Sequence, residues 1–389
     1  MMPAVHIPKP RILLPVPKAE WRTPSRAQPK DCFGNENRTR FRLRARLHDG
    51  HVVWRGWFDD RDDADAFLTA IALGTLHQQP DLWRLPTPQW YPDLGERLSY
   101  DFATVTFLTS PTGSNQTYTS PSDWNNSNNN IQTLGSGGSG GVVVTTSGGK
   151  HVTGGGGGAW NKTTNLSFAT PGTTTATYRI ATGATAASST TFSVGNDGGD
   201  SWFNGTTLAA SSVGSKGGLA GGAAAGSVSG GAGGTGLSGI GSSSNNGGRG
   251  GNLTGASGSG ASGGGGAAGS TGAGNAGADS TSTSTVYTNG GSGDAGSGGS
   301  SGTGSATVPT SGGDGTEWDG SHGSGGGGGG SGLSSTPGNG GNYGAGGGAM
   351  RLGSGTATSG AGIQGIIVVT YTPLSTYTSG WGNLAMMGM

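Results

Sequence analysis

The residues best suited to chemistry form one short island, Glu317-Trp318-Asp319 followed by His322, within a stretch dominated by glycine. Trp318 could stack on the face of a sugar ring while the two carboxylates accept hydrogen bonds from its hydroxyl groups. His322 with the two carboxylates could instead hold a metal ion. A third interpretation is structural, with Trp318 covering the edge of a glycine-rich bundle, and we favour it.

Tyr343 and Trp202 are further aromatic candidates, and each is more simply explained as part of the fold. No catalytic constellation accompanies them. Cys32 has no identifiable histidine partner, and neither Lys150 nor Lys162 completes the G-x-x-x-x-G-K-[ST] pattern of a phosphate-binding loop. With this much glycine, a G-x-G-x-x-G match means nothing without a strand, turn and helix around it. We therefore expect no enzyme activity, no cofactor and no metal site.

A stripe of arginines, Arg42, Arg44 and Arg46, lies in the alternating sequence TRFRLRARL. Alternation predicts a strand with arginine on one face and apolar residues on the other. The turn HDGH and the returning segment VVWRGWF complete a predicted hairpin over 38–58. Such a stripe could bind phosphate or carboxylate groups, although it is more often the solvated face of a half-buried sheet.

A helix is predicted to follow the hairpin and to end near Gly74. Its apolar residues repeat at helical spacing, and several aspartates crowd its start, where they suit capping and the helix dipole. They lack the alternating spacing and the distal glutamate of a calcium loop. The aspartates are Asp59, Asp60, Asp62 and Asp63.

Composition narrows the class of protein further. The chain has 389 residues, of which 87 are glycine and one is cysteine; 11% are charged and the formal net charge is zero. A lone cysteine argues against a disulfide scaffold and a structural zinc site. We expect no membrane span, because no apolar run is long enough, and no signal peptide, because prolines interrupt the N-terminal sequence. A neutral chain is also poorly suited to nucleic acid.

Glycine is unevenly distributed and so divides the chain near residue 100. The first 100 residues hold only five glycines and most of the charged residues and prolines. We expect an extended, basic, proline-rich arm at 1–37 that docks onto a partner. Residues 38–100 are expected to form a small α+β module.

From residue 101 the pattern predicts a mainly β fold. Short segments rich in threonine, valine and aromatic residues alternate with turns, and GIIVVTYT is apolar enough for a central strand. We expect a β-sandwich or jelly roll over 101–212, closed by a strand at 364–374. The expected strands are 103–108, Ile131–Leu134, Val142–Thr146, Asn165–Ala169, Thr175–Ile180, Thr191–Val194 and 365–372.

Between these strands lies an insertion at 213–363, which holds 59 glycines in 151 residues. It is too poor in large apolar residues for an ordinary core, and composition alone indicates disorder. An ordered alternative is a bundle of polyglycine-II-type rods, with three residues per turn and every backbone hydrogen bond made to a neighbouring rod. Glycine at every third position would permit that approach, as at Gly263, Gly266, Gly269 and Gly272.

From about residue 100 the chain resembles the glycine-rich domain family of phage and prophage tail proteins. The motifs that carry the resemblance are TSPSDWNNSNNNIQTLGSGGSGG, GGGGGAWNKTTNLSFATPGTTTATYRI, GGDSWFNGTTLAASSVGSKGG, GTEWDGSHGSGGGGGG and GIIVVTYTP. Their order and content match over roughly 270 residues. The asparagine-rich run from Trp124 to Asn130 departs from the family, whose members often have a plainer PAGV-like turn there.

The resemblance implies a structural virion protein, made in the bacterial cytoplasm without a signal peptide and located on the phage particle. It implies a tail fibre or fibre-tip adhesin that exposes loops from a polyglycine-II bundle to a host surface glycan or outer-membrane component. Such fibres are commonly trimeric. Residues 1–100 are expected to attach to other virion proteins, with Arg42, Arg44 and Arg46 as candidate contacts. Glu317, Trp318, Asp319, His322 and Tyr343 are the candidate receptor-binding residues.

Two other functions stay open at this point. One is a purely structural role, as a head fibre or a capsid or tail decoration. The other is a glycan-degrading enzyme of the tailspike kind, against which the lack of a recognisable carboxylate pair argues. The last segment, 375–389, is too apolar for a free tail, and we expect it to contact the sandwich or a neighbouring subunit.

Overall fold

The structure of the protein is a computed structural model, which describes residues 103–374 and the backbone of three short strands nearer the N-terminus. The residues within 103–374 that it leaves out are 112, 147, 256–258, 282–284, 295–297 and 334. The described part is mainly β, with antiparallel and mixed sheets and no α-helix. No described helix is long and apolar enough to cross a membrane.

Chain contacts separate two units, 1–102 and 103–389. In the first, β2 (Phe41–Arg46) pairs antiparallel with β3 (Val52–Phe58), as the alternating sequence predicts, and β1 (Lys18–Ala19) pairs with β2. The side chains of the arginine stripe, the predicted helix, Cys32 and the apolar C-terminal tail lie outside the described residues.

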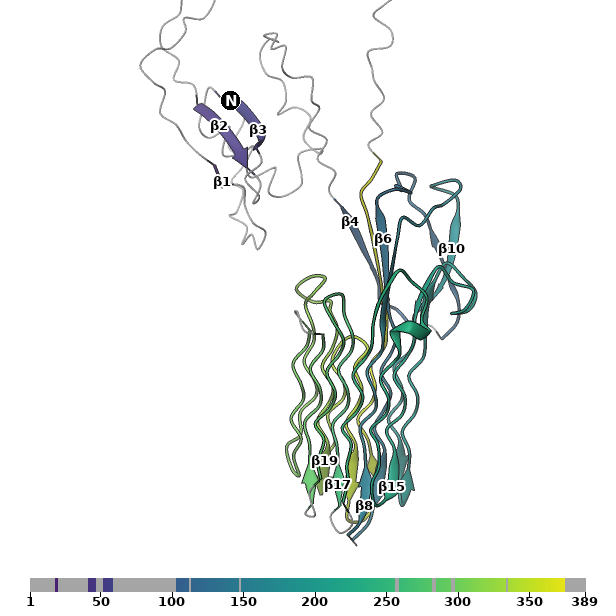
Figure 1. Ribbon diagram of the computed structural model, residues 1–389, viewed down its shortest axis with the longest axis vertical. Coiled ribbons are helices and arrows are strands. Elements are labelled where there is room, and N and C mark those ends of the chain that lie inside the picture. The colour runs from purple at the N-terminus through teal and green to yellow at the C-terminus, as the bar shows by residue number, and fades with distance from the viewer. Residues whose placement is uncertain are drawn as a thin grey trace, which may run out of the picture. The chain divides into compact units, whose positions relative to one another are not determined.

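One end of the second unit consists of two antiparallel sheets, which together we call the base (Figure 1). The final strand of the unit is an interior strand, as expected from its apolar run, and it pairs on both sides. The five-stranded sheet has the order β16 (Ser243–Asn245), β9 (Trp160–Thr164), β6 (Asn129–Leu134), β22 (Ile366–Tyr371), β4 (Thr104–Leu108). The four-stranded sheet has the order β14 (Val213–Ser215), β13 (Ser201–Phe203), β10 (Thr175–Arg179), β5 (Gln116–Thr119).

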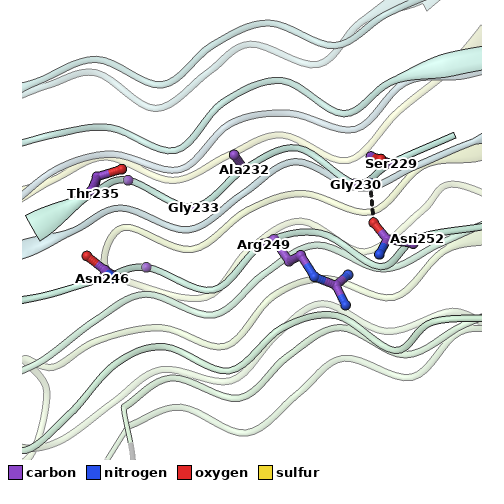
Figure 2. A pocket seen from close by; sticks show the side chains of 10 residues that line it. Ser229, Gly230, Ala232, Gly233, Thr235, Asn246, Arg249 and Asn252 are labelled. Atoms are coloured by element: carbon purple, nitrogen blue, oxygen red, sulfur yellow. Dashed lines mark hydrogen bonds between the residues drawn. The ribbon is translucent and has the colours of Figure 1, made fainter.

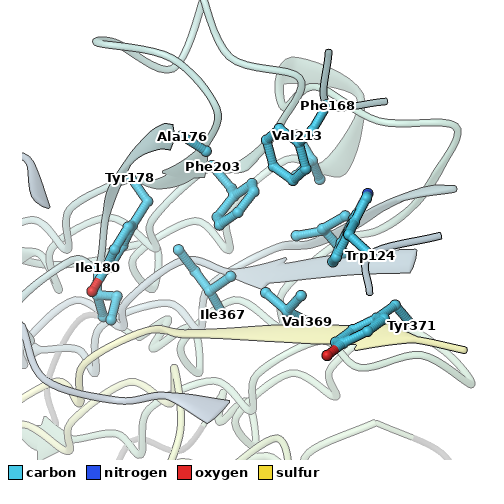
Figure 3. Close-up of a cluster of buried hydrophobic side chains, with 11 residues drawn as sticks. Trp124, Phe168, Ala176, Tyr178, Ile180, Phe203, Val213, Ile367, Val369 and Tyr371 are labelled. Carbon is cyan, nitrogen blue, oxygen red and sulfur yellow. The ribbon is translucent and has the colours of Figure 1, made fainter. Parts of the chain in front are cut away.

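Side chains from both sheets of the base meet in one buried cluster (Figure 3). Ile367 and Val369 project from β22, and Tyr178 and Phe203 project from the four-stranded sheet. Trp124, which precedes β6, is fully buried among them. Each large apolar side chain buried in this way contributes roughly 1.5–3 kcal/mol. The base is therefore the ordinary hydrophobic core of a chain that is otherwise rich in glycine.

The strand predicted over Asn165–Ala169 is wrong. β9 ends just before it, and the first residue of this segment has a φ of 56°, which breaks an extended strand. Side-chain amides replace the missing strand partner. Asn129 bonds both the N–H and the C=O of Leu166, at 2.8 and 3.0 Å, and Asn126 does the same for Phe168, at 2.9 and 3.1 Å. The asparagine-rich run thus holds this segment against the core.

Glycine-rich segments leave the base and run side by side as extended rods (Figure 1). Their hydrogen bonds repeat every third residue. In the segment 153–159, the amides of Thr153, Gly156 and Ala159 all donate to one neighbour, 216–222, each at 2.9 Å. The residues between them bond other neighbours. This repeat matches a backbone with three residues per turn.

The segment 153–159 is surrounded by rods on all sides. Its amides and carbonyls bond six segments: 135–141, 216–222, 229–235, 246–252, 262–269 and 344–350. The rods lie so close that a Cβ atom on Gly156 would lie 2.1 Å from the carbonyl oxygen of Ala232, and one on Gly158 would lie 2.0 Å from that of Gly135. Real Cβ contacts are never that short, so glycine is required at these positions.

The glycines expected at every third position divide into two groups. Gly263 and Gly266 both accept hydrogen bonds from the rod 246–252, at 3.0 and 2.8 Å, as one face of a rod should. Gly269 and Gly272 instead close a turn, with the amide of Gly269 donating to the carbonyl of Gly272 at 3.0 Å. The rod therefore ends near residue 269, earlier than the spacing predicts.

Where a rod has no outer neighbour, side-chain oxygens replace the missing carbonyls. Asp197 and Asp200 accept the amides of Ala220 and Gly217, at 2.7 and 3.0 Å. The two acceptors and the two donors are each three residues apart, so they follow the rod repeat. Further caps of this kind come from Asn246, Asn252, Asn289, Asp314 and Asn339. Asparagine and aspartate therefore finish the edges of the bundle.

At the far end of the rods, short strands and two small apolar clusters hold the bundle together (Figure 1). Val142 and Met350 belong to one cluster, and Val143 and Val152 belong to the other. One sheet has the order β12 (Phe192–Ser193), β7 (Val142–Val144), β20 (Met350–Leu352), β19 (Ser331–Leu333). Another has the order β15 (Ala223–Ala225), β8 (Lys150–Val152), β17 (Gly260–Ala261), β18 (Val286–Tyr287). The remaining elements are the pair β11 (Ser188–Ser189) and β21 (Ala357–Thr358) and the short 3-10 helix η3 (Gly236–Ser238).

Because the rods pack so closely, replacing a glycine inside the bundle should lower the stability of the protein. Gly157→Ala would place a Cβ 2.1 Å from the carbonyl oxygen of Gly266, so we expect a loss of about 3 kcal/mol in the free energy of unfolding. Gly353→Ala is the matched control, because nothing lies within 4 Å of its Cβ position, and we expect it to be neutral or slightly stabilising. Denaturant unfolding of both variants measures the difference. Equal stabilities would show that the rods are not closely packed.

Candidate functional site

The island singled out in the sequence forms a turn between two rods, which we call the 317–322 loop. The amide of Trp318 donates to the carbonyl of His322 at 3.0 Å and closes the turn. The loop lies against the five-stranded sheet, on the face opposite the main core, where Phe107 and Trp318 cover a second apolar cluster. The structure thus brings Glu317, Trp318, Asp319 and His322 together at the base.

The indole of Trp318 is held by the sheet. Its Nε1–H donates to Oε1 of Gln132 at 2.9 Å, and the same oxygen accepts Nε1–H of Trp160 at 3.1 Å. The ring is partly buried against the cluster that includes Leu134 and Val368. The indole N–H is therefore paired within the protein and the ring packs on the apolar cluster, which favours the structural interpretation of this tryptophan.

Asp319 organises the turn. Its Oδ1 accepts the amides of Ser321 and His322, both at 2.7 Å, and its Oδ2 lies 2.8 Å from Nδ1 of His322. Burial acts to raise the pKa of Asp319, but the hydrogen bonds from Ser321 and His322 outweigh it and lower that pKa to about 2. The carboxylate is thus charged and committed to the loop itself.

The imidazole of His322 is the middle ring of a stack. It lies parallel to the ring of Phe107, with centroids 4.0 Å apart, and parallel to that of Tyr343, with centroids 5.9 Å apart. Tyr343, the fifth candidate from the sequence, is buried. The stack joins β4 to the 317–322 loop and to the turn before the rod 344–350, so the aromatic groups act as packing between elements.

Glu317 points inward and is the least satisfied group of the loop. Its Oε1 accepts the amide of Ser324 at 2.6 Å, while its buried Oε2 has no hydrogen-bond partner among the described residues. A Cβ on Gly269 would meet carboxylate oxygens of both Glu317 and Asp294, so the two groups border the same space. Burial raises the pKa of Glu317, and the charge of Asp294 acts in the same direction.

The remaining candidates have different surroundings. Trp202 is buried, the guanidinium of Arg179 lies 5.1 Å from the centroid of its ring, and its Nε1 has no partner among the described residues. Within the part of the chain that the structure describes, no group of three or more histidine, cysteine, aspartate or glutamate residues could hold a metal ion. Arg42, Arg44 and Arg46 lie on β2, and their side chains are outside the described residues.

Three residues of this site were missed in the sequence: Phe107, Gln132 and Asp294. Phe107 and Gln132 lie on the two strands of the five-stranded sheet that flank β22, at positions facing away from the main core. Alternation along those strands could have identified the face, but not what covers it. Asp294 lies in a glycine-rich segment with no pattern that would mark it as a partner of Glu317.

Glu317 and Asp319 should give opposite pH dependence of stability. The folded protein holds the proton of Glu317 more tightly than the unfolded chain, so this group's contribution falls as pH rises through its pKa. Glu317→Gln should remove that fall. Asp319→Asn is the control of opposite sign, because its carboxylate stabilises the fold above its unfolded pKa, and this contribution is lost as pH falls towards about 2.

Thermal unfolding from about pH 3 to 8 measures both variants against the wild-type protein. We expect the advantage of Glu317→Gln over the wild-type protein to grow as pH rises, and the deficit of Asp319→Asn to shrink as pH falls. Parallel profiles for Glu317→Gln and the wild-type protein would contradict the buried, unpaired position of Glu317.

Comparisons with known proteins give this site no named counterpart. No family model matches the chain, and a search of curated proteins returns no significant match. The resemblance to the glycine-rich domain of phage tail proteins thus rests on the motifs quoted above. The loop's own contacts favour a structural role, in which it fastens the bundle to the outer face of the base.

Proposed function

We propose that this protein is a structural virion component of a phage or prophage, without enzyme activity, and that it is a tail fibre or fibre-tip adhesin. The sequence motifs shared with the glycine-rich tail domain support this proposal. We further propose that the base is a β-sandwich of jelly-roll type and that the rods form a bundle of the polyglycine-II type. The repeat of three residues and the six neighbours of 153–159 support that assignment.

The single observation that carries the proposal is the pairing of the first and last described strands of the second unit. Thr104 at the start of β4 pairs with Tyr371 at the end of β22, so these two strand ends lie side by side at the base. The rods run from the base to turns at the opposite end (Figure 1). A bundle that is attached to the base at one end, with hydrogen bonds between its rods along their length, is suited to projecting a binding surface away from a particle.

The proposal assigns partners to the two units. Residues 1–100, with Arg42, Arg44 and Arg46 as candidate contacts, attach to other virion proteins, and the bundle contacts a host surface glycan or outer-membrane component. We propose a homotrimer on the virion surface. Because the indole N–H of Trp318 and the carboxylate of Asp319 are paired within the protein and Glu317 points inward, the loop residues serve the fold, and host contact falls to the exposed flanks and far end of the bundle.

A second candidate function is a head fibre or decoration protein without a receptor. The side-chain caps favour it, because Asp197, Asp200 and the other capping residues occupy many outward amides that a ligand would otherwise use. An adhesin needs free polar groups on at least one surface. A passive projection needs none.

Competition for host adsorption separates the two functions. Purified full-length protein, added in excess to host cells, should reduce adsorption of the parent phage at least tenfold if it is the adhesin. The Gly157→Ala variant, in which the bundle is disturbed, should compete less well than Gly353→Ala. Undiminished adsorption at saturating concentrations of folded protein would contradict the adhesin and favour the passive role.

A further inference from the structure

A polar groove of about 500 Å³ runs along one flank of the bundle (Figure 2). Its walls are two neighbouring rods, 229–235 and 246–252, which are joined by backbone hydrogen bonds of 2.8 and 2.9 Å. A volume of this size lies within the range of known ligand sites. No residue of the 317–322 loop lines the groove.

Two rows of side chains line the groove at every third residue. One row is Ser229, Ala232 and Thr235, all exposed, and the other is Asn246, Arg249 and Asn252. Figure 2 shows the rows following the two rods. A backbone that rises about 3.1 Å per residue with three residues per turn repeats such groups roughly every 9.3 Å. The groove therefore presents side chains at regular intervals along a line, with a hydroxyl at both ends of one row (Ser229 and Thr235) and an amide at both ends of the other (Asn246 and Asn252).

Hydrogen-bond donors remain free along this line. The amides of Gly230 and Gly236 are capped by Asn252 and Asn246, at 2.9 and 2.7 Å. Between them the amide of Gly233 has no partner among the described residues, and Arg249, the residue between the two asparagines in that row, has a side chain with no acceptor to cap it. The Nδ2 amides of both asparagines are likewise unpaired in the described part of the chain.

The groove carries little net charge. Arg249 is paired with Asp279 through two hydrogen bonds of 2.6 Å, and it also donates to the carbonyl of Gly250 at 2.9 Å. No other charged residue and no aromatic ring lines the groove. A charged polymer or a stacked planar ligand is therefore poorly matched, and a neutral chain rich in oxygen acceptors is well matched.

We propose that this groove binds an extended, uncharged polysaccharide that carries acetamido groups. Carbonyl oxygens of such a chain would accept hydrogen bonds from Gly233 and from the amides of Asn246 and Asn252, and the hydroxyls of Ser229 and Thr235 would pair with ring hydroxyls. The repeat of the groove suits a regular polymer rather than a compact ligand. This inference deepens the proposed adhesin function, on which the host source of the polymer rests.

A second glycine rod from another copy is the other possible occupant, and the groove disfavours it. Rods join by direct contact of their backbones, as in 153–159, whereas here two rows of side chains stand beside the glycine floor. Asn246 and Asn252 already occupy two of the amides that a further rod would need. The asparagine caps thus block the backbone amides that a further rod would bond, while the Nδ2 groups of the same asparagines stay free to donate.

Ala232→Trp tests the proposal. The indole would fill the middle of the groove, and no hydrogen bond is lost because the alanine side chain makes none. Ser301→Trp is the matched control, an exposed residue within a different glycine-rich segment that does not line the groove. The probe is the hexamer of β-1,4-linked N-acetylglucosamine, titrated into the full-length protein by calorimetry. Dextran, which has hydroxyls but no acetamido groups, is the comparison ligand.

We expect the hexamer to bind the wild-type protein and Ser301→Trp alike, independently of salt, with at least tenfold weaker binding to Ala232→Trp and to dextran. Hydrogen exchange of the Gly233 amide should slow when the hexamer is bound. Absence of binding, or equal binding by Ala232→Trp, would overturn the proposal. So would self-association that Ala232→Trp abolishes, because the groove would then hold a second copy.

Two combined outcomes separate this inference from the adhesin proposal. If the wild-type protein and Ala232→Trp block phage adsorption equally well, the adhesin proposal stands and the groove is not its binding site. If the hexamer binds in the groove but the protein does not compete for adsorption, the groove proposal stands and the adhesin proposal fails.

Discussion

The structure depends on one constraint, the contact of backbones without side chains between them. In the segment 153–159 every direction holds another rod, and a Cβ on Gly156 or Gly158 would lie about 2 Å from a neighbouring carbonyl oxygen. Hydrogen bonds between rods are possible only at that distance. The abundance of glycine is therefore a requirement of the packing, and the rarer residues appear where a rod faces solvent, a turn or the base.

Hydrogen bonds alone do not account for the order of such a bundle. Fixing the backbone of one residue costs roughly 1–2 kcal/mol, and glycine loses more freedom than other residues. A hydrogen bond returns only about 0.5–1.5 kcal/mol net. This return falls short of the cost, so the apolar clusters matter: Trp124 and Phe203 anchor the base, and Val142, Val152 and Met350 hold the far end. The rods are short spans between two hydrophobic anchors.

Sequence patterns predict the parts of this fold in which side chains alternate. The apolar run of β22, the alternation along β2 and the short segments between turns at β4 and β6 identify strands correctly. They fail at Asn165–Ala169, where the side chains of Asn126 and Asn129 replace a strand partner. The rods cannot be predicted in the same way, because a run of glycines has no side-chain pattern to indicate which residue faces which neighbouring rod. The 317–322 loop is visible as a polar island, but its partner Gln132 comes from a strand far away in the sequence.

The central claim is that the glycines are ordered by hydrogen bonds between rods, and hydrogen–deuterium exchange of the full-length protein tests it most directly. The amides of 153–159 are enclosed on all sides, so they should exchange only when the whole unit unfolds. They should be as slow as those of β22 in the base. Complete exchange of 153–159 within seconds, while β22 stays protected, would show that the bundle is not formed and would contradict the account.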